Sequence, residues 1–498
     1  MKLKELIKDL KVEKITSHSN PDILGLTYDS RKVREGYLFV AIVGSKEDGH
    51  RYLNDAAEQG AKAMVIEKDT VFAEKNVVKI VVKDSRVALA HLASNFYHSP
   101  SKNLKVIGVT GTNGKTTVTY LLDSILKTAG YKTGLIGTIT YKIGERLIAA
   151  QNTTPQSLEI QNLLAELVRE KSDYLVMEVS SHSLVQHRVE KIEFDAGIFT
   201  NLTKFEHLDY HRNMKQYLSA KLLLFRKYLA ESSKKKKSAI INLDDPFASH
   251  FIKAAKKNGI KPITYGMKKG DVTARNYLPT ELGASFKIRT PFGNLQIFSR
   301  LIGKFNLYNI LAAVSLGIAE RIDLSVIKKG IERMEVIPGR LEVVDCGQPF
   351  KIIVDYAHTA SALKNLLLLA KELSFKRILL IFGCGGDRDK RKRPLMGAIA
   401  AKFTDFFIIT SDNPRSEEPA SIIRNVERGI KRRYRKKYRV EADREKAIRQ
   451  GLALAKPGDL FIVAGKGHET YQILKDTIVP FDDRLMVRKI LQNTEWKP

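Results

Sequence analysis

Cysteine is scarce in this chain. This scarcity limits the disulfides and zinc sites that it could form and indicates the redox state of its compartment. The 498 residues include two cysteines, Cys346 and Cys384, which are too few for a disulfide framework. Neither belongs to a CxxC pair or to a Cys/His cluster, so no zinc site is predicted. A reducing, cytoplasmic location is therefore expected.

Long apolar runs are missing as well. No stretch approaches the roughly 20 apolar residues that a transmembrane helix needs. Residues 1–5, Met-Lys-Leu-Lys-Glu, lack the apolar core of a secretory signal. The sequence therefore predicts a soluble protein.

Acidic residues are too few to balance the basic ones. The chain has 84 Lys and Arg against 55 Asp and Glu, a formal net charge of +29. Such an excess suits nucleic acid, an anionic membrane surface or anionic substrates. Much of it lies at residues 234–237, expected in a solvated loop, and at 431–439, expected at the end of a basic helix. Because no RNA- or DNA-binding signature accompanies these runs, we expect no specific nucleic-acid partner, and weak association with an anionic membrane surface is a hypothesis.

The length favours about three domains, because a single core rarely supports a chain of this size. Short apolar runs alternate with helical segments throughout, which predicts an α/β protein. We expect a small α/β domain at 1–100, a central parallel α/β domain at 101–339 and a Rossmann-like α/β domain at 340–498. A linker at 98–101 and a Pro-Gly turn at 338–339 mark the boundaries. The expected strands include 38–42, 63–66, 77–82, 104–109, 174–177, 239–242, 352–354, 377–382, 406–410 and 460–463.

A glycine-rich loop between a strand and a helix is the most informative motif. Residues 110–117, Thr-Gly-Thr-Asn-Gly-Lys-Thr-Thr, follow the apolar run 104–109 and precede an amphipathic pattern at 118–126. Backbone amides and the helix N-terminus would face phosphate oxygens, with Lys115 on the β/γ-phosphates and Thr116 on Mg²⁺. Val109 departs from the standard phosphate-loop pattern, and a purely structural glycine turn is the alternative. The Gly-Lys-Thr ending favours ATP.

Residues suited to a metal follow in the same block. Glu178 ends a predicted strand, where parallel sheets bind ligands, although a solvated carboxylate is the alternative. The loop at 200–211 holds His207 and His211. Each of them is a candidate for contact with a ligand or substrate, and a histidine without such a contact is the alternative. Lys221 lies inside an apolar helical stretch, and its residue type alone predicts a snorkelling side chain.

Several motifs together resemble the Mur ligase family, almost from end to end. They are residues 29–31 with 44 and 48–50, the loop 110–117, residues 152–155, 178–188, 303–309, 338–340 and 355–358, in the order of that family. The chain departs from the family pattern at Ser183, Glu206 and Ala360, where Gly, Asp and Pro are expected.

The resemblance implies an ATP-dependent amide ligase of peptidoglycan synthesis that uses Mg²⁺ and takes UDP-MurNAc-L-Ala-D-Glu as acceptor, acting as a monomer. It implies catalytic and metal roles for Lys115, Thr116, Glu178, His207 and Lys221, the last carrying a carbamate. It implies ATP contacts by Gly111, Thr112, Asn113, Gly114, Lys115, Thr116, Thr117, Asn306, Asn309, Arg340, Asp355 and His358. The sugar-peptide would contact Ser30, Thr153, Thr154, Ser180, Gln186 and Arg188.

The added amino acid is expected to bind the third domain. The family members that add meso-diaminopimelate usually carry the Asp-Asn-Pro-Arg sequence found at 412–415. An arginine suits the second carboxylate of that substrate better than the cationic end of lysine. The resemblance therefore implies meso-diaminopimelate contacts by Arg388, Asp412, Asn413, Arg415, Gly465 and Glu469.

Other functions stay open from the sequence. The same reaction with L-lysine, another Mur ligase or a folylpolyglutamate synthase would share the phosphate loop. A basic ATPase acting on nucleic acid, or an inactive scaffold at the membrane, would suit the charge.

Overall fold

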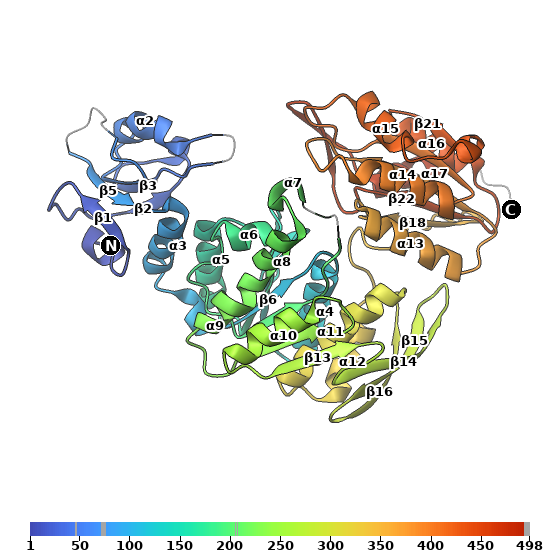
Figure 1. Ribbon diagram of the computed structural model, residues 1–498, viewed down its shortest axis with the longest axis horizontal. Coiled ribbons are helices and arrows are strands. Elements are labelled where there is room, and N and C mark those ends of the chain that lie inside the picture. Colours follow the sequence, from blue (N-terminus) through green and yellow to red (C-terminus); the bar gives the residue numbers. More distant parts are fainter. Residues whose placement is uncertain (45–46, 71–75, 205, 207, 493–498) are drawn as a thin grey trace.

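The computed structural model describes residues 1–44, 47–70, 76–204, 206 and 208–492. Three β-sheets form the centres of three domains, and the first and third domains lie at opposite ends of the central one (Figure 1). Within the described residues, no helix has the length and apolarity to cross a membrane. The α/β class predicted from the alternating pattern is confirmed.

The first domain is built on five strands in the order β1-β5-β4-β3-β2, and β1 alone runs antiparallel to its neighbour. The apolar runs at 38–42, 63–66 and 77–82 form three of these strands, as predicted. The elements are α1 (Leu3–Leu6), β1 (Val12–Ile15), β2 (Gly25–Thr27), β3 (Tyr37–Val40), α2 (Leu53–Glu58), β4 (Ala63–Ile66), β5 (Val78–Val82) and α3 (Ser85–Phe96).

The segment 98–101, expected to be a linker, leads into a packed helical junction. A 3₁₀ helix, η3 (Pro100–Asn103), joins the domains, and both Pro100 and Ser101 are buried. The Ser101 hydroxyl accepts a hydrogen bond from the backbone N–H of Glu193 at 3.2 Å. The junction is therefore packed onto the central domain.

The central sheet has eleven strands in the order β16-β15-β14-β13-β12-β11-β6-β10-β7-β8-β9. Its middle is parallel, as predicted, but antiparallel hairpins extend it at both edges. The strands are β6 (Lys105–Thr110), β7 (Thr133–Ile136), β8 (Thr140–Ile143), β9 (Arg146–Ala149), β10 (Tyr174–Glu178), β11 (Ala196–Phe199), β12 (Ser238–Asn242), β13 (Pro262–Gly266), β14 (Val272–Pro279), β15 (Ala284–Thr290) and β16 (Gly293–Ser299).

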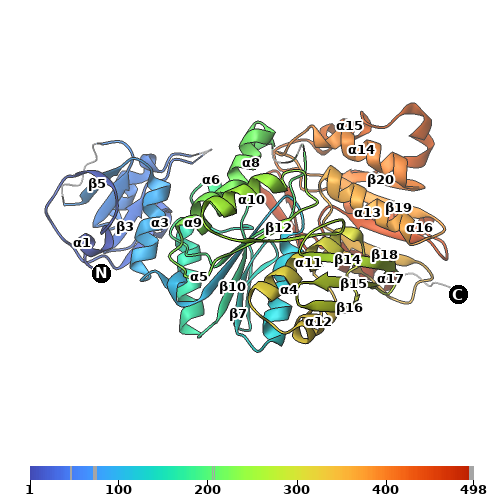
Figure 2. The ribbon, with the colours of Figure 1, turned by 60° about the horizontal axis from the view of Figure 1, so that its bottom comes forward.

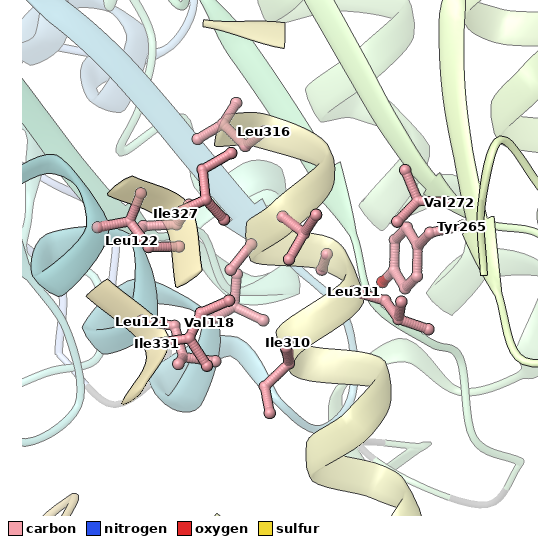
Figure 3. Packing of buried hydrophobic residues seen from close by; sticks show 14 of the residues in the cluster. Val118, Leu121, Leu122, Tyr265, Val272, Ile310, Leu311, Leu316, Ile327 and Ile331 are labelled. Carbon is pink, nitrogen blue, oxygen red and sulfur yellow. The ribbon is translucent and has the colours of Figure 1, made fainter. Parts of the chain in front are cut away.

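Helices cover both faces of this sheet (Figure 2). Apolar side chains of α4, α11 and α12 meet in one cluster, where Val118 and Leu122 lie near Ile310 and Ile327 (Figure 3). A second cluster holds α5, α8 and α10 against the other face. The helices are α4 (Lys115–Thr128), α5 (Ser157–Arg169), α6 (Ser181–Val185), α7 (Leu208–His211), α8 (Met214–Leu223), α9 (Leu229–Glu231), α10 (Ala248–Lys257), α11 (Lys304–Ala319) and α12 (Leu324–Glu332).

The third domain has a six-stranded sheet in the order β17-β18-β22-β19-β20-β21, with a separate hairpin of β23 and β24. Helices α13, α14 and α15 cover one face, whereas α16 and α17 cover the other. The elements are β17 (Glu342–Val343), β18 (Lys351–Asp355), α13 (Ala360–Glu372), β19 (Ile378–Cys384), α14 (Lys392–Phe403), β20 (Phe406–Ser411), α15 (Pro419–Glu427), β21 (Tyr438–Val440), α16 (Arg444–Leu454), β22 (Leu460–Ala464), β23 (Tyr471–Leu474), β24 (Thr477–Pro480) and α17 (Asp483–Gln492).

The two basic runs differ from their predicted structures. Residues 431–439 do not end a basic helix: a 3₁₀ helix, η5 (Arg432–Lys437), leads into the edge strand β21. In the run 234–237, Lys235 and Lys236 are exposed, as expected of a solvated loop. Lys234 instead donates to the Leu104 carbonyl at 2.8 Å, and Lys237 to the Ala230 carbonyl at 2.9 Å. Half of this lysine run therefore caps backbone oxygens.

Candidate active site

The glycine-rich loop follows β6 in the middle of the central sheet and leads into α4. Gly114 has a φ of 87°, and a Cβ there would lie 2.2 Å from Asn309 Oδ1. Asn201, which follows β11, fixes the loop: its side-chain oxygen accepts a hydrogen bond from the Asn113 N–H at 3.0 Å. Glycine is therefore required at 114 by both backbone conformation and space.

Two lysines converge beside the loop. Lys115 Nζ donates to the carbonyls of Gly111 and Thr112 at 2.9 Å and 3.0 Å. Lys221 Nζ donates to the same Gly111 oxygen at 2.8 Å and lies 4.7 Å from the centre of the Tyr217 ring. Burial lowers the pKa of Lys115 and, together with the charge of Lys115, lowers the pKa of Lys221 well below its ordinary value. Lys221 is 1% exposed, so the prediction of a snorkelling side chain is wrong.

Glu178 places a carboxylate next to this loop. It ends β10, is 1% exposed and accepts from Thr116 Oγ1 at 2.9 Å. The backbone N–H of Thr138 donates to the same carboxylate at 2.8 Å. A buried carboxylate beside a hydroxyl is the donor set that Mg²⁺ prefers, so these residues fit the ion.

The loop 200–211 contains two histidines that were candidates for ligand contacts, His207 and His211. His207 lies outside the described residues. His211 Nε2 lies 2.8 Å from Ser181 Oγ, and burial lowers the pKa of His211 to about 4. Among the residues that the structure describes, no group of three His, Cys, Asp or Glu side chains is placed to hold a metal.

The side chains expected to hold the sugar-peptide meet near the carboxyl end of β10. Thr154 Oγ1 donates to the Glu178 carbonyl at 2.9 Å, and Ser180 N donates to Thr154 Oγ1 at 3.1 Å. Arg188 donates to the Thr154 carbonyl at 2.7 Å and to Gln186 Oε1 at 2.7 Å. Thr153 lies 3.1 Å from the Thr138 hydroxyl, measured between the two Oγ1 atoms.

The remaining residue of that set, Ser30, belongs to the first domain. It starts the short 3₁₀ helix η1 (Ser30–Lys32), beside a cavity of about 430 Å³ between the first and central domains. Asp29 and Arg31 line this cavity, but Ser30 is not among its lining residues. Across it, the Tyr28 hydroxyl donates to Glu159 at 2.7 Å.

A larger cavity, of about 550 Å³, opens between the phosphate loop and the third domain. Its lining includes these predicted ATP contacts: Asn113, Gly114, Thr116, Thr117, Asn306, Asn309, Arg340 and Asp355. Asp244 also lines it. Its Oδ2 accepts from Tyr308 OH at 2.8 Å, while its buried Oδ1 has no partner. This orphaned acceptor suits an N–H group of a bound base.

Arg340 connects the third domain to the phosphate loop. Its guanidinium lies 4.7 Å from the centre of the Tyr356 ring and donates to Thr116 Oγ1 at 3.4 Å. Asp355 and His358 serve the backbone here: Asp355 accepts from the Leu341 N–H at 2.8 Å, and His358 Nδ1 lies 2.8 Å from the Tyr356 carbonyl oxygen. Burial raises the pKa of Asp355 and lowers that of His358 to about 3.

The residues expected to bind the amino acid form one polar group on the third domain. Asn413 Nδ2 donates to Glu469 at 2.8 Å, and the fully buried Lys466 donates to both of these side chains at 3.0 Å. Arg415 Nη1 donates to the Gly386 carbonyl at 2.9 Å. Arg388 lies nearby, since a Cβ on Gly385 would be 3.0 Å from Arg415 Nη1 and 3.8 Å from Arg388 Cγ. Burial, and next the charge of Arg388, lower the pKa of Arg415.

Two further members complete this group. Gly465, with a φ of 118°, would place a Cβ 2.8 Å from Asp412 Oδ2. The Tyr356 hydroxyl donates to Glu469 at 3.4 Å and thereby connects this group with Arg340. Sequence reasoning missed Asn201, Lys466 and the anchoring role of Tyr356, because each of them contacts a residue outside its own sequence motif.

Comparison with known families covers most of the chain. The family model described as the Mur ligase family catalytic domain matches residues 22–97, the Mur ligase middle domain matches 109–317, and the Mur ligase glutamate ligase domain matches 339–467. A Syntrophomonas wolfei protein named UDP-N-acetylmuramoyl-L-alanyl-D-glutamate–2,6-diaminopimelate ligase is 46% identical, with 99% of each chain covered. The chain belongs to the Mur ligase family.

Other Mur ligases support this placement. A Geobacillus kaustophilus protein of the same name is 43% identical over 98% of this chain and 99% of its own. A solved structure with that enzyme name has a TM-score of 0.69 and 30% identity, with 99% of each chain covered. A Thermotoga maritima MurF ligase in complex with ADP has a TM-score of 0.64 and 18% identity over 94% of this chain and 97% of its own, which shows the shared fold alone. The family resemblance of the sequence is confirmed.

Proposed function

We propose that the protein uses ATP to join meso-diaminopimelate to the D-glutamate γ-carboxylate of UDP-MurNAc-L-Ala-D-Glu, in the synthesis of peptidoglycan precursors. The observation that carries this proposal is the connection from Thr116 through Arg340 and Tyr356 to Glu469. This connection supports a catalytic centre formed jointly by the loop 110–117 and the group around Glu469. The names of the relatives that cover the whole chain support the same reaction.

In the first step, the γ-carboxylate oxygen attacks the γ-phosphorus of ATP, and the bond to the bridging oxygen of ADP breaks. Lys115 would turn from the Gly111 carbonyl to the phosphoryl oxygens and offset their charge. Thr116 and Glu178 would hold Mg²⁺ together with His207 and carbamylated Lys221, and the ion would supply further positive charge. The product is an acyl phosphate.

In the second step, a neutral amine of the amino acid attacks the acyl carbon. The new C–N bond forms, phosphate leaves, and the amine proton passes to solvent. Because water would hydrolyse the acyl phosphate, the third domain is expected to close over the cavity. Arg340 bridges the two domains at this place and would accompany that closure.

We further propose that Lys221 carries a carbamate. The side chain is buried and lies beside the cationic Lys115, two conditions that favour the neutral amine. A neutral amine attacks CO₂, forms an N–C bond and releases one proton, which leaves a carboxylate suited to Mg²⁺. Mass spectrometry of the intact protein under CO₂ tests this, since the modified chain is heavier by one CO₂ and Lys221→Met is not.

The choice of amino acid rests on two neighbouring guanidiniums. Arg388 and Arg415 together offer a concentration of positive charge to the second carboxylate of meso-diaminopimelate, whereas the ammonium end of L-lysine would be repelled. L-lysine is the alternative substrate.

The decisive experiment supplies purified protein with ATP, Mg²⁺ and UDP-MurNAc-L-Ala-D-Glu, with meso-diaminopimelate or L-lysine in parallel, and measures both phosphate release and the amide product. Product with meso-diaminopimelate alone is expected. Product with lysine alone would overturn the specificity, and no product with either would favour another amide ligase of this fold. ATPase activity stimulated by nucleic acid instead would favour the basic ATPase.

The setting of the reaction is also part of the proposal. We propose a monomeric protein of the cytoplasm whose exposed cations at 431–439 associate weakly with anionic lipid. Sedimentation with anionic and neutral vesicles at low salt tests the last point, because equal binding to both would exclude it.

A further inference from the structure

We propose that an ion pair between the buried Arg393 and the partly buried Glu417 positions Arg388 and Arg415 for the second carboxylate of the diamino acid. This inference rests on the proposed function and deepens it. Neither member of the pair would touch the substrate. Their task is to hold two loops at a fixed separation, and we therefore call them positioning residues.

The pair is bidentate, and its arginine is buried. Arg393 comes from α14 and is 0% exposed. Its Nη1 donates to Glu417 Oε2 at 2.9 Å, and its Nη2 donates to Glu417 Oε1 at 2.8 Å. Nη2 also donates to the Gly385 carbonyl at 3.2 Å. Both terminal nitrogens of this guanidinium are bound by the protein, while its buried Nε has no partner among the described residues. Because the side chain is fully buried, Arg393 is not available to a ligand.

The same pair joins the loop after β19 to the loop after β20. Glu417 Oε1 accepts from the Asp387 N–H at 2.8 Å. The Ser416 hydroxyl donates to Asp387 Oδ1 at 2.6 Å, which ties the two loops a second time. Asp387 immediately precedes Arg388, while Ser416 and Glu417 immediately follow Arg415. Each tie is therefore one or two residues from an arginine of the amino-acid site.

Such ties are needed because the two arginines repel each other. Both side chains lie beside Gly385, where a Cβ would be 3.0 Å from Arg415 Nη1 and 3.8 Å from Arg388 Cγ, and the charge of Arg388 lowers the pKa of Arg415. When no carboxylate is bound, this like-charge pair opposes close approach of the two loops. Arg393 and Glu417 add no net charge, so they hold the loops together without weakening the positive potential that a carboxylate requires.

The test is the steady-state kinetics of Glu417→Gln, which keeps the shape of the side chain and removes its charge. We expect KM for meso-diaminopimelate to rise about tenfold while kcat and KM for ATP stay within about twofold. The matched control is Asp459→Asn, which removes the carboxylate of the Arg377–Asp459 pair next to the amino-terminal ends of the central strands β19 and β22. It should leave all three constants unchanged. Glu417→Asp, which restores the charge, should recover part of the lost affinity.

A second variant, Ser416→Ala, provides a test if Glu417→Gln does not fold. Ser416 is exposed, so Ser416→Ala removes the outer tie without disturbing the core, and KM for the amino acid should rise about threefold. Wild-type KM in folded Glu417→Gln, or in Ser416→Ala if the former does not fold, would overturn the inference. Equal losses in KM for ATP would also overturn it, since they indicate general damage. If the wild-type protein itself makes no product with meso-diaminopimelate, the proposed function fails first, and the inference fails with it.

Discussion

Lys115 and Lys221 share one acceptor, the carbonyl oxygen of Gly111, at 2.9 Å and 2.8 Å. Two buried amines on one oxygen are stable only if at least one of them is neutral or if anions arrive. The phosphate chain of ATP and a carbamate on Lys221 would supply those anions. The arrangement would therefore suit two different negative groups.

Replacing Lys221 by methionine should separate activity from stability. We expect kcat to fall by about 100-fold or more, because the carbamate that would stabilise the phosphoryl transfer is lost. The melting temperature should not fall, since an apolar side chain replaces a buried amine. Lys227→Met is the matched control: it removes the Lys227–Glu190 pair and should lower stability without lowering kcat. Added bicarbonate should raise wild-type activity and leave Lys221→Met unchanged.

Asp244→Asn should weaken selection of the nucleotide base. Asp244 lines the cavity and its buried Oδ1 has no partner, whereas an amide at this place can present a donor instead of an acceptor. We expect KM for ATP to rise about tenfold and the preference for ATP over GTP to fall. Competition kinetics with both nucleotides measures this. Asp271→Asn, on an exposed carboxylate bound to Thr264, should change neither value.

Two substitutions of Tyr356 should distinguish its ring from its hydroxyl. Tyr356→Leu removes the face on which Arg340 rests, so kcat should fall by about tenfold or more. Tyr356→Phe keeps that face and loses only the 3.4 Å hydrogen bond to Glu469, so its kcat should stay within about threefold of wild type. Equal losses in the two variants would contradict a role for the stacked guanidinium.

His91 should make stability depend on pH at the junction between the first and central domains. Burial, and next the charge of Lys191, lower its pKa from 6.5 to about 4. As the pH falls, the unfolded chain therefore binds a proton at His91 before the folded chain does. The contribution of His91 to the free energy of unfolding is complete above pH 6.5 and is lost as the pH falls to about 4. Partial exposure limits it to about 1 kcal/mol. When the pH is lowered between these values, the melting temperature of His91→Gln should fall less than that of wild type.

Local patterns in the sequence were sufficient for the elements that bear the site. The apolar runs at 104–109, 174–177 and 406–410 form β6, β10 and β20, and the polar motifs follow their carboxyl ends. Periodicity is a property of neighbouring residues, so the sequence carries it directly. The edge hairpins of the central sheet and the packed junction at η3 were not predicted, because both depend on which distant segments they meet.

Residue type and motif order by themselves determined that this chain is an α/β protein of the Mur ligase family, with a phosphate loop ending in Gly114 and Lys115. Only the tertiary structure decided that Lys221 is buried, that Arg340 rests on Tyr356 and that Arg393 pairs with Glu417. These relationships join residues on different elements, and Lys221 shows why that matters. Burial sets the cost of its charge, and burial is fixed by every segment packed around a side chain rather than by its neighbours in sequence.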